Sequence, residues 1–262
     1  MRPSKKLTVA FIMILSFTPV WNHVNAQSKI AIRYLTQIRG TSSISYNFFV
    51  GPDASDFSTS VNGFGSGLLD FFGIRSSVDL LNIGTEKNYV SLGAGISVLK
   101  YRLSKNLIFG QNQDNQLTWM TDPEVTHNYV NTFFGYGKSK IITTSFYFPL
   151  DINIGIGKNI SIIAGGYFDM NATARYKMKY LVGEDKVKEI IKSDEFRKFN
   201  PSTTKFGVNF AILHKKLGYG LSATYSLTPF FVSGTGPDIH EARISATYSL
   251  QPLKKPSLKG KD

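Results

Sequence analysis

The sequence predicts an all-β protein, an eight-stranded antiparallel up-and-down barrel, and three observations support this. Eight segments alternate apolar residues with polar or small ones. The connections between these segments alternate in length, long and then short. The chain has no cysteine, so an exported domain of this size must be stabilised without disulfides. Alternation with period two is typical of a strand whose two faces meet different surroundings.

The N-terminal residues 1 to 26 have the pattern of a secretory signal peptide. Arg2, Lys5 and Lys6 form a basic start, an apolar run follows, and Val24-Asn25-Ala26 supplies a small-residue cleavage site. A membrane-spanning anchor is the alternative, but the run is shorter than the roughly 20 residues that a spanning helix needs. Residues 27 to 39 then form an apolar and basic lead-in, which could be a plug, an edge strand or a periplasmic arm.

The net charge is strongly positive. The formal charge is +12, and removal of the three basic residues of the signal lowers it to +9. The remaining excess is spread over turns, loops and the tail, and acidic residues dilute it between 174 and 201. This distribution disfavours nucleic acid as a partner and favours an anionic lipid or polysaccharide surface.

The first three predicted strands lie between residues 41 and 98. Residues 41 to 51 alternate cleanly, and the loop that follows is rich in Asp, Ser, Thr and Gly. The second strand, residues 64 to 81, is patterned less regularly. A tight turn at 84 to 87 leads into the third strand, residues 90 to 98.

The most regular part of the chain is the hairpin between residues 142 and 170. Its two arms are separated by a short turn at 155 to 159, and each arm is about twice as long as an ordinary globular strand. Arms of this length fit tilted transmembrane strands. One face of each arm is formed by apolar or small residues at even-numbered positions. They are Ile142, Phe146, Phe148, Leu150, Ile152, Ile154, Ile160, Ile162, Ala164, Gly166, Phe168 and Met170.

Two long connections flank this hairpin. The first, residues 104 to 137, is polar, with the run Gln111 to Asn115 at its centre. The second, residues 174 to 201, places four apolar residues at near-helical spacing and predicts a short surface helix. Those residues are Val187, Ile190, Ile191 and Phe199.

The last three strands are predicted at 205 to 212, 219 to 227 and 243 to 250. A turn at 214 to 216 joins the first two, and a moderate loop, 230 to 241, joins the last two. We therefore expect the barrel to occupy residues 40 to 251. Residues 252 to 262, rich in Lys and Pro, are expected to be a disordered basic tail.

Alternation alone does not say which face lies inside the barrel. A soluble lipocalin-like carrier would bury the apolar face, whereas a transmembrane barrel turns it toward lipid. Here the polar positions are mostly Ser, Thr, Asn and Gly, which suits the narrow interior of an eight-stranded barrel. The mid-strand charges have both signs and could neutralise one another in the lumen; they are Asp151, Asp169, Lys205 and Arg243. Five aromatics near strand ends are expected to form interfacial girdles: Tyr101, Phe109, Tyr219, Phe230 and Phe231.

The hairpin with Phe148-Pro149-Leu150, its Gly/Lys turn and the return Ala164-Gly165-Gly166 resembles the PorT-like outer-membrane β-barrel proteins of Bacteroidetes. The strand that begins Asn88-Tyr89-Val90 and the hairpin of residues 206 to 227 are similar to the same group. The resemblance covers most of residues 40 to 250. It implies location in the outer membrane of the cell envelope and brings no catalytic residues with it.

No candidate site in the sequence stands out. Ser233, Asp238 and His240 have the types of a nucleophile, an orienting acid and a base, but a Ser/Gly/Pro/Asp loop is also ordinary turn chemistry. His127 and His214 are too far apart to predict a metal site. The glycine-rich run 63 to 67 lacks the lysine of a phosphate loop. We therefore expect no catalytic residue, no cofactor and no metal.

These observations favour a non-enzymatic outer-membrane barrel with a structural or binding role through its extracellular loops. The expected partners are outer-membrane lipid, lipopolysaccharide and the barrel-assembly machinery, while the sequence names no ligand for the loops. Two alternatives remain: an outer-membrane barrel enzyme that modifies lipid, and the soluble lipocalin-like carrier.

Overall fold

The computed structural model describes residues 31–34, 40–55, 57, 72–85, 87–103, 107–114, 116–121, 138–182 and 185–250. The predicted signal peptide, the glycine-rich run, His127 and the C-terminal tail lie outside these residues. Within them, no helix is both long enough and apolar enough to cross a membrane.

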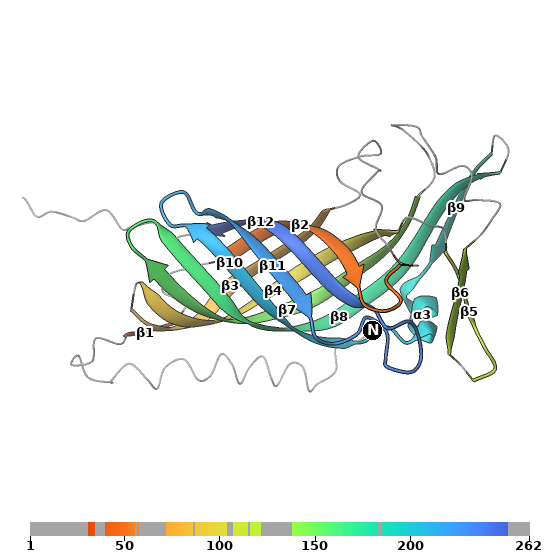
Figure 1. The fold of residues 1–262 in the computed structure, drawn as a ribbon, viewed down its shortest axis with the longest axis horizontal. Coiled ribbons are helices and arrows are strands. Elements are labelled where there is room, and N and C mark those ends of the chain that lie inside the picture. The colour runs from red at the N-terminus through yellow and green to blue at the C-terminus, as the bar shows by residue number, and fades with distance from the viewer. Residues whose placement is uncertain are drawn as a thin grey trace, which may run out of the picture.

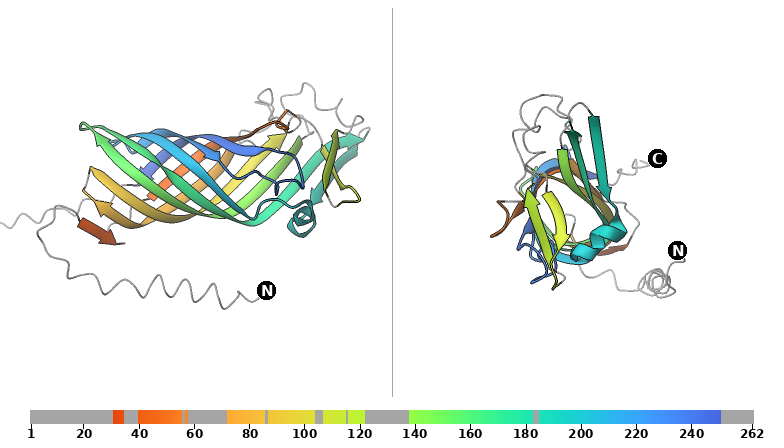
Figure 2. Two further views of the ribbon diagram at one scale, coloured as in Figure 1. Left: turned by 60° about the horizontal axis from the view of Figure 1, so that its bottom comes forward. Right: turned by 90° about the vertical axis from the view of Figure 1, so that its right-hand side faces the viewer.

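Eight antiparallel strands close into a ring, as the alternation predicts (Figures 1 and 2). Each strand of the ring pairs with the next, and the last strand pairs back with the first, from His240↔Val50 to Leu250↔Gly40. The strands are β2 (Gly40–Val50), β3 (Phe72–Gly84), β4 (Asn88–Leu103), β7 (Lys138–Ile156), β8 (Ile160–Val182), β10 (Thr204–His214), β11 (Tyr219–Ser226) and β12 (His240–Leu250).

The two ends of the barrel differ. At one end lie the three short turns, β3–β4, β7–β8 and β10–β11, together with the start of β2 and the end of β12. At the other end lie the long connections, β2–β3, β4–β7, β8–β10 and β11–β12. Strand β1 (Ala31–Tyr34), part of the predicted lead-in, is an edge strand that pairs with the last residues of β3 at the short-turn end.

The apolar face of the strands points outward, and the polar face fills the interior. Phe146, Leu221 and Ile244 are 45%, 68% and 57% exposed, whereas Ser97 and Ser145 are buried and lie within 3.1 Å of each other across the β4–β7 pair. This confirms the orientation that the composition of the polar face predicts. A soluble carrier barrel would have the opposite arrangement.

Strands β7 and β8 extend beyond the rest of the ring at the long-connection end. They have 19 and 23 residues, against 11 in β2, β10 and β12. A β-bulge interrupts their pairing, because Thr144 pairs with Thr173 and Ser145 with Asn171, leaving Ala172 without a partner in the ladder. A bulge adds one residue and so exchanges the faces of the strand. Asp169 consequently points inward below the bulge, and the even-numbered residues of β8 point inward above it.

The helix predicted between residues 174 and 201 is largely wrong. Val187, Ile190 and Ile191 belong to strand β9 (Asp185–Ile191), which pairs with the extension of β8. Helical structure is limited to α3 (Ser193–Phe196) and the 3-10 turn η4 (Arg197–Phe199). The extension of β8 would have unpaired backbone N–H and C=O groups at its edge. Pairing these groups with β9 stabilises the chain more than the helix predicted from four apolar residues would.

Short elements from the connections cover the long-connection end. The first long connection contains the hairpin of β5 (Leu107–Gln111) and β6 (Leu117–Thr121), whose turn includes Asn112. This hairpin and α3 stand at the end of the barrel, in front of the ring in the end-on view of Figure 2. The polar connection predicted from sequence therefore contains ordered structure.

Gly207 on β10 tests the packing of the lumen. A Cβ at this position would overlap the Tyr167 ring and the Tyr225 carbonyl oxygen, whereas a Cβ at Gly166, on the outer face, would lie 3.5 Å from the nearest atom outside its own neighbours. We expect Gly207→Ala to lower the free energy of unfolding by about 1–3 kcal/mol, as overpacking does. Gly166→Ala is the matched control and should stay near wild type. Urea titration of the folded fraction in detergent measures both, and equal stability of the two variants would contradict the packing described.

Candidate functional site

The interior of the barrel contains buried ion pairs. Arg75 on β3 donates from Nη2 to Asp169 Oδ2 on β8 at 2.7 Å. The guanidinium carbon of Arg75 also lies 3.7 Å from the centroid of the Tyr147 ring and 4.8 Å from that of Tyr167. Arg75 therefore joins β3, β7 and β8 across the lumen by an ion pair and two cation–π contacts.

A second pair lies closer to the long-connection end. The Lys205 ammonium is 2.9 Å from Glu241 Oε2, and both side chains are 1% exposed. Glu241 also accepts a hydrogen bond from the Tyr101 hydroxyl, and Lys205 Nζ lies 4.3 Å from the centroid of the Phe230 ring. The pair thus connects the polar lumen to the aromatic residues above it.

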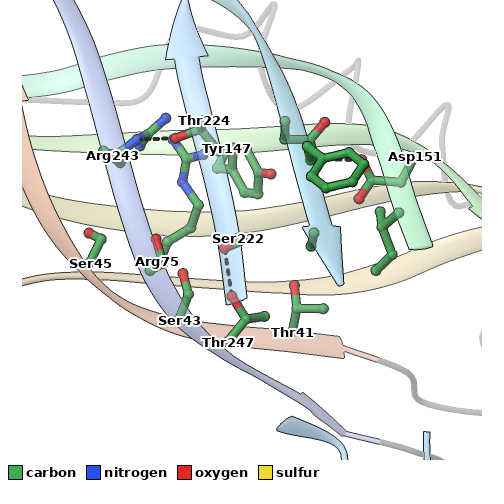
Figure 3. A pocket seen from close by; sticks show the side chains of 15 residues that line it. Thr41, Ser43, Ser45, Arg75, Tyr147, Asp151, Ser222, Thr224, Arg243 and Thr247 are labelled. Atoms are coloured by element: carbon green, nitrogen blue, oxygen red, sulfur yellow. Dashed lines mark hydrogen bonds between the residues drawn. The ribbon is translucent and has the colours of Figure 1, made fainter. Parts of the chain in front are cut away.

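Arg243 lines a small cavity in the lumen (Figure 3). Its Nε donates to Thr224 Oγ1 at 2.6 Å, while its Nη1 and Nη2 atoms are buried without a hydrogen-bond partner among the protein atoms described. Asp151 accepts a hydrogen bond of 2.6 Å from Asn209 on the same cavity wall. The cavity measures about 50 Å³, room for only a few waters, which would satisfy these buried donors.

Charged side chains of both signs lie in this interior. Arg75, Lys205 and Arg243 supply three positive charges, and Asp151, Asp169 and Glu241 supply three negative ones. We call these six side chains the lumen network. Of the four residues predicted as lumen packing, Asp169 and Lys205 each take part in an ion pair, but their partners, Arg75 and Glu241, were not predicted. Glu241 could have been found, because it lies two residues before Arg243 and so on the same face of β12.

Above the lumen network, aromatic side chains form a compact cluster. Their rings are within 4.5–6.4 Å of one another in stacked, tilted and edge-to-face pairs. They come from β2, β4, β5, β8, α3 and the β2–β3 and β11–β12 connections. We call this cluster the aromatic cap: Phe49, Phe57, Tyr101, Phe109, Tyr176, Phe196, Phe230 and Phe231.

The aromatic cap corrects the girdle prediction. Tyr101, Phe109, Phe230 and Phe231 are buried, with Tyr101 and Phe230 completely so, and they pack inside the end of the barrel. Only Tyr219 is exposed on the outer surface, where it packs against Tyr248. The physical reason is that the connections fold back over the strand ends, so that aromatics there find a core instead of an interface.

The three residues considered for a catalytic role do not form a triad. His240 Nδ1 lies 3.0 Å from the Ser226 carbonyl oxygen, and Nε2 lies 3.4 Å from Asp238 Oδ1. Both ring nitrogens thus have partners other than Ser233, whereas a general base must hydrogen-bond its nucleophile. The backbone amide of Asp238 donates to Asp53 Oδ2 at 2.7 Å, so this acid stands in a loop-to-loop contact.

The described part of the chain brings together no group of three or more His, Asp or Glu side chains suited to a metal. His214 closes the β10–β11 turn, where its Nδ1 accepts from the Leu217 amide at 3.3 Å. The ion pairs and hydrogen bonds of the lumen network make it a packed filling of the barrel.

Comparison with known proteins gives only distant similarity. No family model matches the chain, and no curated protein matches it. Among solved structures, the chain is similar to the crystal structure of Neisserial surface protein A, with 7% identity and a TM-score of 0.32 over 82% of this chain and 96% of that one. It is also similar to a mutant of Rh. blastica porin, with 10% identity and a TM-score of 0.16 over 84% of this chain and 100% of that one.

Proposed function

We propose that the protein is an outer-membrane β-barrel, closed to solutes and non-enzymatic, that binds partners through its long-connection end. The observation that carries the proposal is the apolar outer surface of a closed ring with a polar interior. In a bilayer every backbone group must be satisfied within the protein, which a barrel without free edges achieves. A surface of exposed Ile, Leu, Val and Phe that surrounds the molecule is stable in hydrocarbon and unfavourable in water.

The filling of the barrel supports a closed state. The lumen network and the aromatic cap occupy successive levels of the interior, and the cavity between side chains is far too small for a solute path. Transport would require both levels to rearrange. The resemblance to the PorT-like family also supports an outer-membrane location, and it rests on the sequence pattern of residues 142 to 169.

Apolar side chains at the long-connection end support a binding role. Ile108 and Met120 pair across the β5–β6 hairpin and are 43% and 64% exposed. Val232, which follows the cap residues Phe230 and Phe231 in the sequence, is also exposed. In the usual orientation of such barrels the short turns are periplasmic and the long connections extracellular. These side chains would then be presented outside the cell, where a protein partner could cover them.

Two apolar residues of similar exposure test the membrane location. Ile244 is 57% exposed on the outer wall, and Met120 is 64% exposed on the β5–β6 hairpin. An arginine facing lipid costs about 2–4 kcal/mol near the middle of the bilayer, so Ile244→Arg should reduce the amount of assembled barrel, while Met120→Arg should not. Membrane fractionation and the faster migration of unheated protein in SDS gels measure assembly.

The same assay contains the outcome that would reject the proposal. In a soluble barrel both side chains would face water, and both arginine variants would assemble equally. Recovery of the wild-type protein in the soluble periplasmic fraction without detergent would reject a membrane location outright. Wild-type protein that stays with the membrane and shifts on heating, together with loss of assembly in Ile244→Arg alone, supports it.

A further inference from the structure

The small cavity in the lumen is lined by two arginines and one acidic residue. Arg243 on β12 is 3% exposed and Arg75 on β3 is 7% exposed. Their guanidinium carbons lie 5.2 and 4.8 Å from the centroid of the same ring, that of Tyr167. The acidic residue, Asp151, accepts a hydrogen bond from Asn209 and stands across the cavity from Arg243 in Figure 3. Positive charge is therefore concentrated on one side of the cavity.

Both arginines keep N–H groups that no described residue accepts. In Arg243 these groups are on Nη1 and Nη2, in Arg75 they are on Nε and Nη1, and all four nitrogens are buried. Arg75 uses Nη2 for Asp169, and Arg243 uses Nε for Thr224. A guanidinium group has five N–H donors, so each arginine has more donors than the surrounding side chains and backbone accept.

Arg243 also has no ion-pair partner among the residues that the structure describes. The carboxylates of Asp169 and Glu241 are each paired with another cation, at 2.7 Å with Arg75 and at 2.9 Å with Lys205. Waters in the cavity would accept the hydrogen bonds but would leave the charge of Arg243 uncompensated. A buried cation without a counterion is unfavourable. An anion in the cavity would satisfy the donors and the charge together.

Hydroxyl groups line the way from the short-turn end of the barrel to the two arginines. The inward face of β12 continues from Arg243 to Ser245 and Thr247, and the inward face of β11 adds Thr224 and Ser222. The Ser222 and Thr247 hydroxyl oxygens lie 2.6 Å apart across these two strands. Hydroxyls rotate and donate as their surroundings require, so this lining is suited to an anion. Toward the other end the lumen network and the aromatic cap fill the barrel.

We propose that the arginine side of this cavity binds a single halide ion, such as chloride. One negative charge matches the one cation that lacks a counterion. The cavity measures about 50 Å³, and a water molecule takes up about 30 Å³ of liquid, so an ion of about that size fits and a phosphorylated metabolite does not. The site depends only on the barrel interior, not on the proposed membrane location. Because the ion binds in a closed lumen, the barrel does not conduct it.

Chloride titration of the purified full-length barrel in non-ionic detergent tests this site. The chlorine NMR line of chloride broadens when the ion exchanges with a protein site, and sodium gluconate, whose anion is too large for the cavity, keeps the ionic strength constant. Arg243→Gln removes the unpaired charge, and Ser43→Met keeps both arginines but fills the cavity. Lys216→Gln removes an exposed cation from the β10–β11 turn, and Ser42→Met adds the same side chain to the adjacent outward position.

We expect the wild type, Lys216→Gln and Ser42→Met to show saturable broadening that bromide displaces. Arg243→Gln and Ser43→Met should bind chloride at least about tenfold more weakly, since a hydrogen bond to a charged group is worth about a factor of ten or more. Absence of saturable broadening in the wild type would mean that water alone occupies the cavity and would overturn the inference. Equal chloride affinity in wild type and Arg243→Gln would overturn it as well.

Heat-modifiable migration of every sample shows which variants form the barrel. If Arg243→Gln does not fold, Ser43→Met decides the result, because chloride binding at wild-type strength in a barrel with a filled cavity would contradict the site. Membrane fractionation of the wild type separates this inference from the proposed function. A membrane-assembled barrel that binds no chloride rejects the halide site alone, whereas a soluble protein that binds chloride rejects the membrane location alone.

Discussion

Lys205→Met should lower the free energy of unfolding by about 3–5 kcal/mol, the usual cost of removing one partner from a buried ion pair. Lys205 and Glu241 are both fully buried and 2.9 Å apart, so the remaining carboxylate would keep its charge without its counterion. Glu241→Gln should cost a similar amount, because it leaves the ammonium buried. Urea titration of the folded barrel in detergent, followed by heat-modifiable migration, gives the free energies.

The double variant Lys205→Met/Glu241→Gln separates this pair from general loss of packing. It removes both charges, and glutamine still accepts a hydrogen bond from Tyr101. We expect it to be more stable than either single variant, because no uncompensated charge remains. Lys216→Met, at an exposed turn, should change stability by less than about 0.5 kcal/mol. Additive losses in the double variant would show that the two side chains are not coupled.

Phe230→Ala should destabilise the protein by about 3–5 kcal/mol, the range for a buried phenylalanine. Its ring contacts Phe49, Tyr101 and Phe231, at centroid distances of 5.2, 6.1 and 5.0 Å. Its backbone carbonyl also accepts from the Ser202 amide at 2.8 Å, which ties the β8–β10 and β11–β12 connections together. The loss should therefore also expose residues 227 to 239 to proteinase K.

Val232→Ala is the control for the aromatic cap, because Val232 belongs to the same connection but is 47% exposed. It should leave the urea midpoint and the proteolytic pattern unchanged. Phe230→Leu should fall between the two, since leucine retains part of the buried apolar volume but has no ring to face Lys205. If Phe230→Ala were cleaved no faster than Val232→Ala, the cap would not hold these connections in place.

The eight strands and their orientation could be predicted because the evidence is local. Period two along each segment identifies a strand, and the small polar residues at alternate positions, such as Ser91 and Ser245, identify the interior. The lengths of the connections then fix which strands are neighbours in an up-and-down barrel. All three signals can be read from the sequence without knowledge of any tertiary contact.

The aromatic cap could be predicted only in part. Tyr101 follows Ser97 and Leu99 at intervals of two, so its inward direction was present in the sequence although its position near a strand end suggested a girdle. Phe57 and Phe230 lie in connections, where no period defines a face. Their burial depends on how four connections fold against one another, which is tertiary information. Strand β9 was missed for the same reason, because its pairing depends on the unusual length of β8.

The unpaired residue Ala172 sets a rule for how this part of the molecule can evolve. The additional residue there determines that Tyr176 faces inward, as part of the aromatic cap, and that Arg175 faces outward. A further insertion or deletion of one residue between Ala172 and Arg175 would exchange these directions, whereas a change of two residues would preserve them. Homologous chains should therefore differ in length here by even numbers, or carry a second compensating irregularity.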